Sequence, residues 1–317
     1  MSSPASARVT TPFGATSTAA DVLAGVRLDG RRAVVTGGGG GLGRETARAL
    51  AAAGAEVVLA ARRLGGAEEA AREIAAATGN PAVRAAALDL ADPTSVAAFV
   101  SGWSGPLHVL VNNAGVMATP EARTAAGREL QFATNHLGHF ALATGLRAAL
   151  AAAGNARVVS VSSVGHINGP VRFDDPDFTR EPYDPWLAYA QSKTANILFA
   201  VEAASRWAGD GIAVNALNPG RIAETSLGRH LQTPPASFDP AGATGVSVKN
   251  TEQGAATSAL LAGSPLVEGV TGRYFEDCQE AGPHEEGVRR GVAAYALDRA
   301  HARRLWELSA RLTGTGA

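Results

Sequence analysis

The chain of 317 residues contains one cysteine, Cys278, and only two lysines, Lys193 and Lys249. One cysteine cannot form an internal disulfide, and no cluster of cysteine and histidine indicates a metal site, so we expect no metal. Charged residues make up 18% of the chain and the formal net charge is −1, which argues against nucleic acid as a partner. No apolar run reaches the roughly 18 uncharged residues of a membrane span, and the N-terminus has no apolar signal core. These absences together predict a soluble, cytoplasmic, globular protein.

Short apolar runs alternate along the chain with longer alanine-rich stretches of helical period. Because the runs are apolar throughout, they predict parallel strands that are buried on both faces of a sheet. The fold class that follows is α/β, with one doubly wound (Rossmann) parallel sheet, helices on both faces and ligands at the carboxyl ends of the strands. We predict strands at Ala33–Thr36, Glu56–Ala61, Ala82–Asp89, Leu107–Asn112, Arg157–Val161, Ile212–Leu217 and Gly272–Phe275, and helices at Leu42–Ala53, Gly66–Thr78, Pro93–Trp103, Gly127–Ala153, Leu187–Trp207 and Thr251–Ala262.

The chain divides into a polar N-terminal extension, residues 1–27, and one domain, residues 28–317. Two segments interrupt the rhythm of strands and helices: Gly165–Trp186 is rich in proline and aspartate, and Arg221–Asn250 is rich in small polar residues, proline and glycine. Loops of this length in a compact α/β domain are often functional. We therefore expect residues 221–250 to form a substrate loop.

Five consecutive glycines, Gly37–Gly41, directly follow the first predicted strand and precede the first long helix. A flexible linker has no reason to lie between a buried strand and an amphipathic helix, whereas glycines there let the backbone approach a pyrophosphate at the helix N-terminus. The run fits two registers: G-x-G-x-x-G starting at Gly38, and T-G-x-x-x-G-x-G starting at Thr36 and ending at Gly43. Either register predicts a bound dinucleotide.

The second predicted strand is followed by Arg62 and Arg63 and carries no acidic residue at its tip. An acidic residue there would bond the ribose hydroxyl of NAD, whereas the fork of an arginine suits the 2′-phosphate of NADP. We therefore favour NADP(H) as the cofactor, with NAD(H) as the alternative. A solvated helix start is the other explanation of these two arginines.

One of the two lysines follows a tyrosine by four residues, in Tyr189-Ala190-Gln191-Ser192-Lys193. On a helix these two side chains share a face. A free phenol has a pKa of ~10, which is too high for proton exchange near neutrality. An ammonium ~4 Å away contributes up to roughly 4 kcal/mol at an effective dielectric of ~20. We therefore expect Lys193 to lower the pKa of Tyr189 and make it a general acid/base.

These features occur together in an order that resembles the short-chain dehydrogenase/reductase family, whose members transfer a hydride between NAD(P)(H) and a carbonyl or alcohol. The resemblance covers nearly the whole chain and selects the register T-G-x-x-x-G-x-G, which leaves Gly38, Gly39 and Gly40 in variable positions. The motifs that carry it are Thr36-Gly37…Gly41-x-Gly43, Asp89, Asn112-Asn113-Ala114-Gly115, Asn135, Ser163, Tyr189-x-x-x-Lys193 and Asn218-Pro219-Gly220.

The resemblance implies a catalytic tetrad. Tyr189 would exchange a proton with the substrate oxygen, and Lys193 would hold the nicotinamide ribose. Ser163 would orient the substrate oxygen, with the adjacent Ser162 as the alternative serine. Asn135 would anchor a water that relays protons to Lys193.

The resemblance also implies the contacts of the cofactor. The pyrophosphate would lie on the glycine turn, the adenine would meet the end of the third strand, and the nicotinamide would lie beside the Pro-Gly turn. The family's usual threonine four residues past Gly220 is replaced here by Glu224, with Thr225 one residue later, so that contact stays open. The cofactor-binding residues implied are Thr36, Gly37, Gly41, Leu42, Gly43, Arg62, Asp89, Leu90, Asn113, Ala114, Gly115, Tyr189, Lys193, Pro219, Gly220 and Ile222.

The long spacing from Ser163 to Tyr189 resembles the spacing in one branch of the family. This branch contains retinol dehydrogenases, the oxidoreductase domain of WW-domain oxidoreductase and protochlorophyllide reductase. This branch implies a small-molecule substrate that is bulky and largely apolar. His166 and Trp186 would then lie with Ser163 and Tyr189 at the substrate site.

Two further expectations concern assembly and catalysis. Homo-oligomers are common in the family, but no residue of this chain establishes one. The alternative function is an NADP-binding sensor or scaffold that catalyses nothing. Such a protein would be expected to lack part of the tetrad, whereas this chain carries all four residues.

Overall fold

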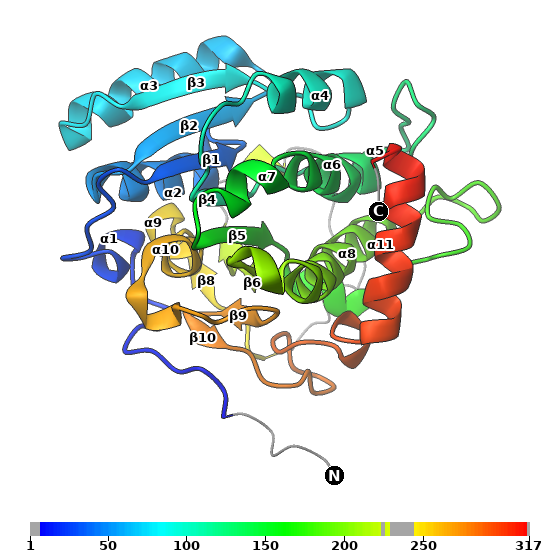
Figure 1. Cartoon of the computed structure of the whole chain (residues 1–317). Helices are drawn as coiled ribbons and strands as arrows, with labels where there is room; N and C mark the ends of the chain where they lie inside the picture. Colours follow the sequence, from blue (N-terminus) through cyan, green and yellow to red (C-terminus); the bar gives the residue numbers. More distant parts are fainter. Residues whose placement is uncertain (1–6, 223–225, 229–243, 316–317) are drawn as a thin grey trace.

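The computed structural model describes residues 7–222, 226–228 and 244–315. An eight-stranded sheet of order β10-β9-β6-β5-β4-β1-β2-β3 forms its centre (Figure 1). Neighbouring strands run parallel, except that β10 is antiparallel to β9. This sheet confirms the prediction of a doubly wound α/β fold. The strands are β1 (Arg32–Thr36), β2 (Glu56–Ala61), β3 (Val83–Ala87), β4 (Val109–Asn112), β5 (Ala156–Val161), β6 (Ile212–Asn218), β9 (Tyr274–Glu276) and β10 (Gln279–Glu280).

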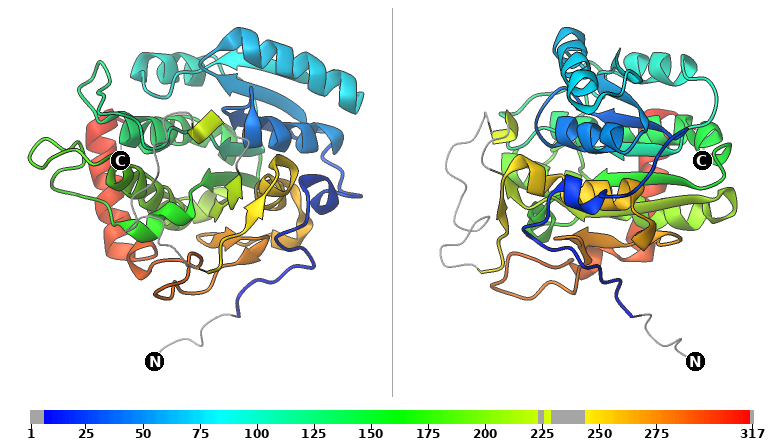
Figure 2. Two further views of the ribbon diagram at one scale, coloured as in Figure 1. Left: turned by 180° about the vertical axis from the view of Figure 1, so that it is seen from behind. Right: turned by 90° about the vertical axis from the view of Figure 1, so that its left-hand side faces the viewer.

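Helices cover both faces of the sheet, as the two views in Figure 2 show. Successive side chains of a strand point to opposite faces, so Val35 belongs to one apolar core and Val34 to the other. The first core is closed by α1 (Ala19–Val22), α2 (Gly41–Ala52), α3 (Leu64–Thr78) and α10 (Ala256–Gly263), and the second by α4 (Pro93–Ser101), α6 (Gly138–Gly145), α7 (Arg147–Ala151), α8 (Pro185–Arg206) and α11 (Arg299–Thr313).

The single helix predicted over Gly127–Ala153 is interrupted. It consists of α5 (Leu130–Phe132), a π-helical turn at Ala133–Leu137, and then α6 and α7. A Cβ atom at Gly138 would collide with the carbonyl oxygen of Leu90, so the helix passes the end of β3 at very close range. π-helical turns inside α-helices are frequently found at functional sites, and this one contains Asn135.

Segments at both ends of the chain complete the two cores. The residues before the first strand are not detached, since the backbone N–H of Val9 donates to the Glu280 carboxylate at 2.9 Å and α1 buries Ala19 and Val22. Figure 1 shows this segment running past the edge of β10 before it reaches α1. At the other end, α11 buries Trp306 in the second core beside α8. The sequence predictions included neither α1 nor α11.

The strand order switches direction at the carboxyl end of β1, which is where open α/β sheets have their ligand crevice. The chain passes from β1 to β2 on one side, whereas β4 lies on the other side. The loops that follow β1 and β4 therefore leave in different directions, and ligands of open α/β sheets bind at such a switch point. The glycine turn and the Asn113–Gly115 loop are these two loops.

Candidate active site

The glycine turn between β1 and α2 has a backbone that glycine adopts most freely. Gly37 and Gly41 have φ angles of +67° and +52°, in the left-handed region that is costly for other residues. A Cβ atom at Gly43 would lie 2.5 Å from the carbonyl oxygen of Gly37, so the first turn of α2 packs directly on the loop. Gly40, the N-cap of α2, has no side chain to bond the first N–H groups of the helix, and such groups bind anions. The turn therefore fits a pyrophosphate.

The three middle glycines differ in the room around them. Nothing lies within 4 Å of a Cβ built at Gly40, and the nearest atom to one at Gly39 is the Ala67 Cα at 3.4 Å. At Gly38, however, a Cβ would lie 2.9 Å from Leu59 Cγ. A side chain therefore has room at Gly39 and Gly40, whereas at Gly38 it would press on Leu59 of β2.

Thr36 joins the glycine turn to the loop after β4. Its hydroxyl oxygen accepts hydrogen bonds from the backbone N–H groups of Asn113 at 2.9 Å and Ala114 at 3.0 Å. It also lies 2.8 Å from Nε2 of His139, whose Nδ1 lies 2.9 Å from the carbonyl oxygen of Asn135. Since a carbonyl only accepts, Nδ1 of His139 carries the proton and Thr36 donates to Nε2. Burial lowers the pKa of His139 to about 4, which keeps this ring neutral.

This arrangement makes Thr36 a positioning residue, because its hydroxyl is fully buried and bonded within the protein. His139 is a site residue that the sequence motifs did not single out. A signal that could have found it is its place four residues after Asn135, on the same face of a helix.

The four tetrad residues meet beside the crevice. Tyr189 and Lys193 lie one turn apart on α8, and the Lys193 Nζ is 5.6 Å from the centroid of the Tyr189 ring. The phenol of Tyr189 is hydrogen-bonded to the Ser163 side chain. Ser163 follows β5 and accepts a hydrogen bond from the backbone N–H of Gly165 at 3.0 Å. The alternative serine, Ser162, instead donates to the carbonyl oxygen of Lys193 at 2.7 Å.

The protonation of the pair differs from the sequence-based expectation. Burial raises the pKa of Tyr189 to about 12, although the hydrogen bond with Ser163 lowers it. Burial also lowers the pKa of Lys193 to about 8. The ammonium of Lys193 donates to the carbonyl oxygen of Val161 at 3.1 Å and lies over the ring of Tyr189. In the protein alone, desolvation therefore outweighs the charge of Lys193, and Tyr189 carries its proton at neutral pH.

Asn135 lies in the π-helical turn and holds the strand-end loop against α8. Its amide nitrogen donates to the carbonyl oxygen of Val116 and to the hydroxyl of Ser192, both at 2.9 Å. Its amide oxygen accepts from the backbone N–H of Val116 at 2.8 Å. A Cβ built at Gly115 would lie 3.1 Å from Asn135 Oδ1 and 3.6 Å from Lys193 Nζ. The side chains of Asn135 and Lys193 therefore both lie next to Gly115.

Other predicted cofactor residues gather around the same crevice. Leu42 and Ile222 approach each other at α9 (Thr251–Gly254), where a Cβ at Gly254 would lie 2.6 Å from Leu42 Cδ2 and 2.8 Å from Ile222 Cγ1. Gly220 has a φ of +92° and follows Pro219 at the end of β6. This places the turn after β6 beside the start of α2.

The predicted adenine side lies at the ends of β2 and β3. Arg62 is exposed directly after β2 and forms no ion pair with a described residue. Asp89 follows β3, and its carboxylate accepts from the backbone N–H of Ala91 at 3.0 Å. Leu90 is buried. The guanidinium and the Asp89–Leu90 backbone thus follow neighbouring strands.

The predicted substrate residues do not all reach the crevice. Trp186 is half-buried and packs with Met117 against Tyr189 and Ala190. His166 is fully buried, with Nδ1 2.7 Å from the carbonyl oxygen of Ser163 and Nε2 accepting from the backbone N–H of Ala293 at 3.2 Å.

The prediction that His166 touches substrate is therefore wrong, because both ring nitrogens bond the backbone and position the loop of Ser163. Glu224 and Thr225 lie outside the described residues, as does most of the predicted substrate loop.

A family model described as "short chain dehydrogenase" matches residues 31–235, which include the turn, the tetrad and the turn after β6. The chain belongs to the short-chain dehydrogenase family. Members of the family bind NAD(P)(H) and act as oxidoreductases on alcohols and carbonyls.

Relatives of this short-chain dehydrogenase span nearly its whole length. A "Probable oxidoreductase" of Streptomyces antibioticus is 57% identical over 88% of this chain and 96% of its own. Retinol dehydrogenase 13 of Mus musculus is 38% identical over 96% of this chain and 92% of its own. A solved structure of an uncharacterised protein from Mycobacterium paratuberculosis matches with a TM-score of 0.73 and 36% identity, over 95% of this chain and 98% of its own.

Within residues 7–222, 226–228 and 244–315 of this short-chain dehydrogenase, no helix has the length and apolar character needed to cross a membrane.

Proposed function

We propose that the protein is an NADP(H)-dependent oxidoreductase in which Tyr189 is the general acid/base for a carbonyl or alcohol of a bulky, largely apolar small molecule. The observation that carries this proposal is the hydrogen bond between Tyr189 and Ser163, with the Lys193 ammonium 5.6 Å from the phenol ring. This pair of hydroxyls stands beside a glycine turn that fits a pyrophosphate. The nicotinamide, when bound, supplies or accepts the hydride.

The side chains divide the remaining work. Tyr189 holds a proton at neutral pH and is placed to donate it to a carbonyl oxygen during reduction. Ser163 donates a second hydrogen bond to the same oxygen and so orients it. Lys193 supports the charge that develops on the phenol oxygen and is placed to bond the nicotinamide ribose.

We assign the parts of the cofactor from the positions of the residues around the crevice. Gly37, Gly41, Leu42 and Gly43 would hold the pyrophosphate, and the turn after β6 would lie at the nicotinamide. Asp89 and Leu90 would meet the adenine. The exposed fork of Arg62, which follows β2 without an acidic neighbour, supports a 2′-phosphate and hence NADP(H).

The apolar substrate class rests on the surroundings of Tyr189 and on the relatives. Met117 and Trp186 pack against Tyr189, and one relative is a retinol dehydrogenase by name. The size and apolar character of these side chains favour a hydrophobic group beside the reacting oxygen.

The test of catalysis measures NADPH consumption with a panel of aldehydes and ketones of increasing apolar size. Tyr189→Phe removes the proton donor and should lower kcat by at least ~100-fold. The matched control is Tyr183→Phe, which removes a phenol that bonds the carbonyl oxygen of Thr119 and should leave most activity. If Tyr189→Phe reduced the panel as fast as the wild type, the assignment of Tyr189 would be wrong. Tight NADPH binding without turnover of any substrate would favour the sensor function instead.

The test of cofactor choice compares kcat/KM for NADPH and NADH. Arg62→Ala should reduce the preference for NADPH about 10-fold to 100-fold, since it removes a charge-assisted hydrogen bond to phosphate. Arg63→Ala, at the equally exposed next residue, is the control. A wild-type preference for NADH would refute the proposal of NADP(H).

A further inference from the structure

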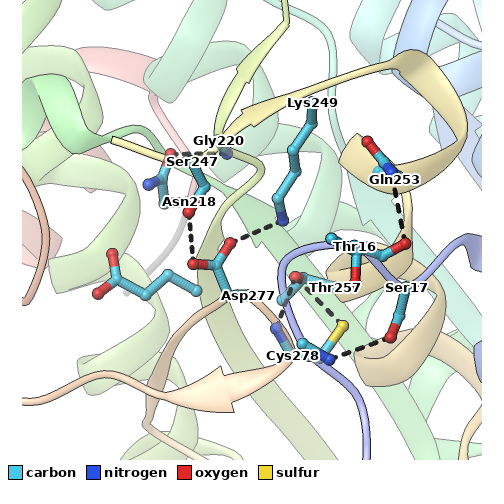
Figure 3. A network of polar contacts seen from close by, with 12 residues as sticks. Thr16, Ser17, Asn218, Gly220, Ser247, Lys249, Gln253, Thr257, Asp277 and Cys278 are labelled. Carbon is cyan, nitrogen blue, oxygen red and sulfur yellow. Dashed lines mark hydrogen bonds and ion pairs between the residues drawn. The ribbon is translucent and has the colours of Figure 1, made fainter. Parts of the chain in front are cut away.

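Lys249, the second of the two lysines, lies outside the tetrad yet is completely buried. It ends the short strand β8 (Val248–Lys249), which pairs in parallel with β7 (Arg221–Ile222). Its side chain has 0% exposure, and its Nζ lies 2.8 Å from Oδ1 of Asp277. Figure 3 shows the lysine extended from β8 toward this carboxylate. A buried charge of this kind is tolerated only beside a partner.

Asp277 lies in the tight turn between β9 and β10. Asp277 and Cys278 have φ angles of +50° and +59°, as the two central residues of a two-residue hairpin loop require. Glycine, asparagine and aspartate are the residues that usually fill such positions, because their backbones tolerate a left-handed conformation best. Asp277 therefore fits the backbone of this tight turn, from which its carboxylate reaches Lys249.

The carboxylate of Asp277 uses both oxygens. Besides Lys249, it accepts from the hydroxyl of Ser247 at 2.6 Å and lies 3.3 Å from Nη2 of Arg290. Burial alone would raise the pKa of Asp277, but the hydrogen bonds from Lys249 and Ser247 and the charges of Lys249 and Arg290 hold it below its usual value. The aspartate therefore stays ionised and keeps the lysine paired.

The pair bears directly on the turn that is assigned to the nicotinamide. A Cβ at Gly220 would lie 2.9 Å from the carbonyl oxygen of Ser247 and 3.1 Å from Cδ of Lys249. The backbone N–H of Arg221 donates to that same carbonyl at 2.9 Å. Gly220 thus packs against the aliphatic part of the Lys249 side chain, and the ammonium at the end of that side chain is paired with Asp277 in the β9–β10 turn.

We propose that the buried pair of Lys249 and Asp277 is a brace that holds Gly220–Ile222 in place for the nicotinamide end of the cofactor. This proposal rests on the proposed function, since it assumes that the turn after β6 lies at the nicotinamide. Lys249 and Asp277 are positioning residues, because neither lies among the tetrad side chains. The brace acts by joining three elements, β7, β8 and the β9–β10 turn, at one point.

The test removes both charges together, because loss of one partner would leave a buried, uncompensated charge that strongly destabilises the fold. In Lys249→Met/Asp277→Asn, methionine keeps an apolar stem against Gly220 and asparagine tolerates the left-handed backbone. The matched control is Arg273→Met, which removes an ion pair to Glu280 on the same hairpin and does not touch Gly220. Two quantities are measured: hydrogen exchange of the amides of residues 220–222, and the Kd for NADPH by fluorescence titration.

We expect hydrogen exchange at residues 220–222 to be about 10-fold faster in the double variant than in the wild type. We also expect the Kd for NADPH to be about 10-fold to 100-fold weaker, because small misplacements of a binding turn are costly. The KM for NADPH should rise more than kcat falls, because the tetrad is untouched. Arg273→Met should change neither quantity, even if it lowers the melting temperature to the same extent.

Unchanged exchange, or faster exchange with an unchanged Kd, would overturn the proposal. A wild-type protein that bound neither NADPH nor NADH would instead contradict the proposed function. In that case the exchange rates would still decide whether the pair holds residues 220–222.

Discussion

Adding a single methyl group to the glycine turn tests how the turn fits a cofactor. In Gly43→Ala the new Cβ would lie 2.5 Å from the carbonyl oxygen of Gly37 and 2.5 Å from Nδ2 of Asn113. Both contacts are far shorter than van der Waals distance, and both neighbours are held, since Asn113 Nδ2 donates to the carbonyl oxygen of Thr36 at 2.8 Å. The turn must therefore open. Overpacking of this kind costs roughly 1–3 kcal/mol.

That cost should be visible in the affinity for the cofactor. If it is borne by the bound state, ~1–3 kcal/mol corresponds to a Kd for NADPH that is about 5-fold to 150-fold weaker. The same methyl in Gly39→Ala would lie 3.4 Å from the Ala67 Cα, which is an ordinary contact, so its Kd should stay within about 2-fold of the wild type. Fluorescence titration gives both constants, and circular dichroism verifies that each variant is folded. Equal affinity of Gly43→Ala and the wild type would refute the assignment of this turn to the pyrophosphate.

Three further predictions concern groups buried near the site. Burial raises the pKa of Glu129 from 4.5 to about 7, so the folded state favours the neutral carboxyl, and the free energy of unfolding should fall by up to roughly 3 kcal/mol as pH rises from about 4.5 to 7. Chemical denaturation at a series of pH values should show this fall in the wild type but not in Glu129→Gln. The same fall in Glu129→Gln would show that Glu129 is not its source. Because the pKa of Lys193 is lowered to about 8, kcat/KM for carbonyl reduction should decline as pH rises through that value, and a profile that is level to pH ~10 would contradict the role of its charge. Thr36→Val leaves the Asn113 and Ala114 N–H groups without their shared acceptor and should lower the free energy of unfolding by at least ~2 kcal/mol, whereas Thr36→Ser keeps the hydroxyl and should not. Thermal denaturation compares the two variants, and equal melting temperatures would show that this hydroxyl is dispensable.

Local sequence determined the order and type of most elements around the site. Unbroken apolar runs predicted parallel strands, and the strands β1, β2, β5 and β6 were placed to within a residue at each end, because burial on both faces leaves a signal in every residue of the run. Tyr189 and Lys193 could be paired from their spacing alone, since helix geometry puts residues four apart on one face. The register of the five glycines needed the downstream motifs, because the run itself fits two patterns.

Only the tertiary structure decided how buried groups are paired and charged. The π-helical turn at Asn135 directly precedes the close approach of Gly138 to Leu90, a contact between residues 48 apart that no local pattern indicates. The raised pKa of Tyr189 follows from desolvation, which depends on everything packed around the phenol, whereas the sequence indicated only its neighbouring charge. His166 has the sequence position of a pocket residue but bonds the backbone on both sides. Spacing along a chain thus specifies which side chains share a helix face, and long-range packing specifies which of them reach solvent, substrate or one another.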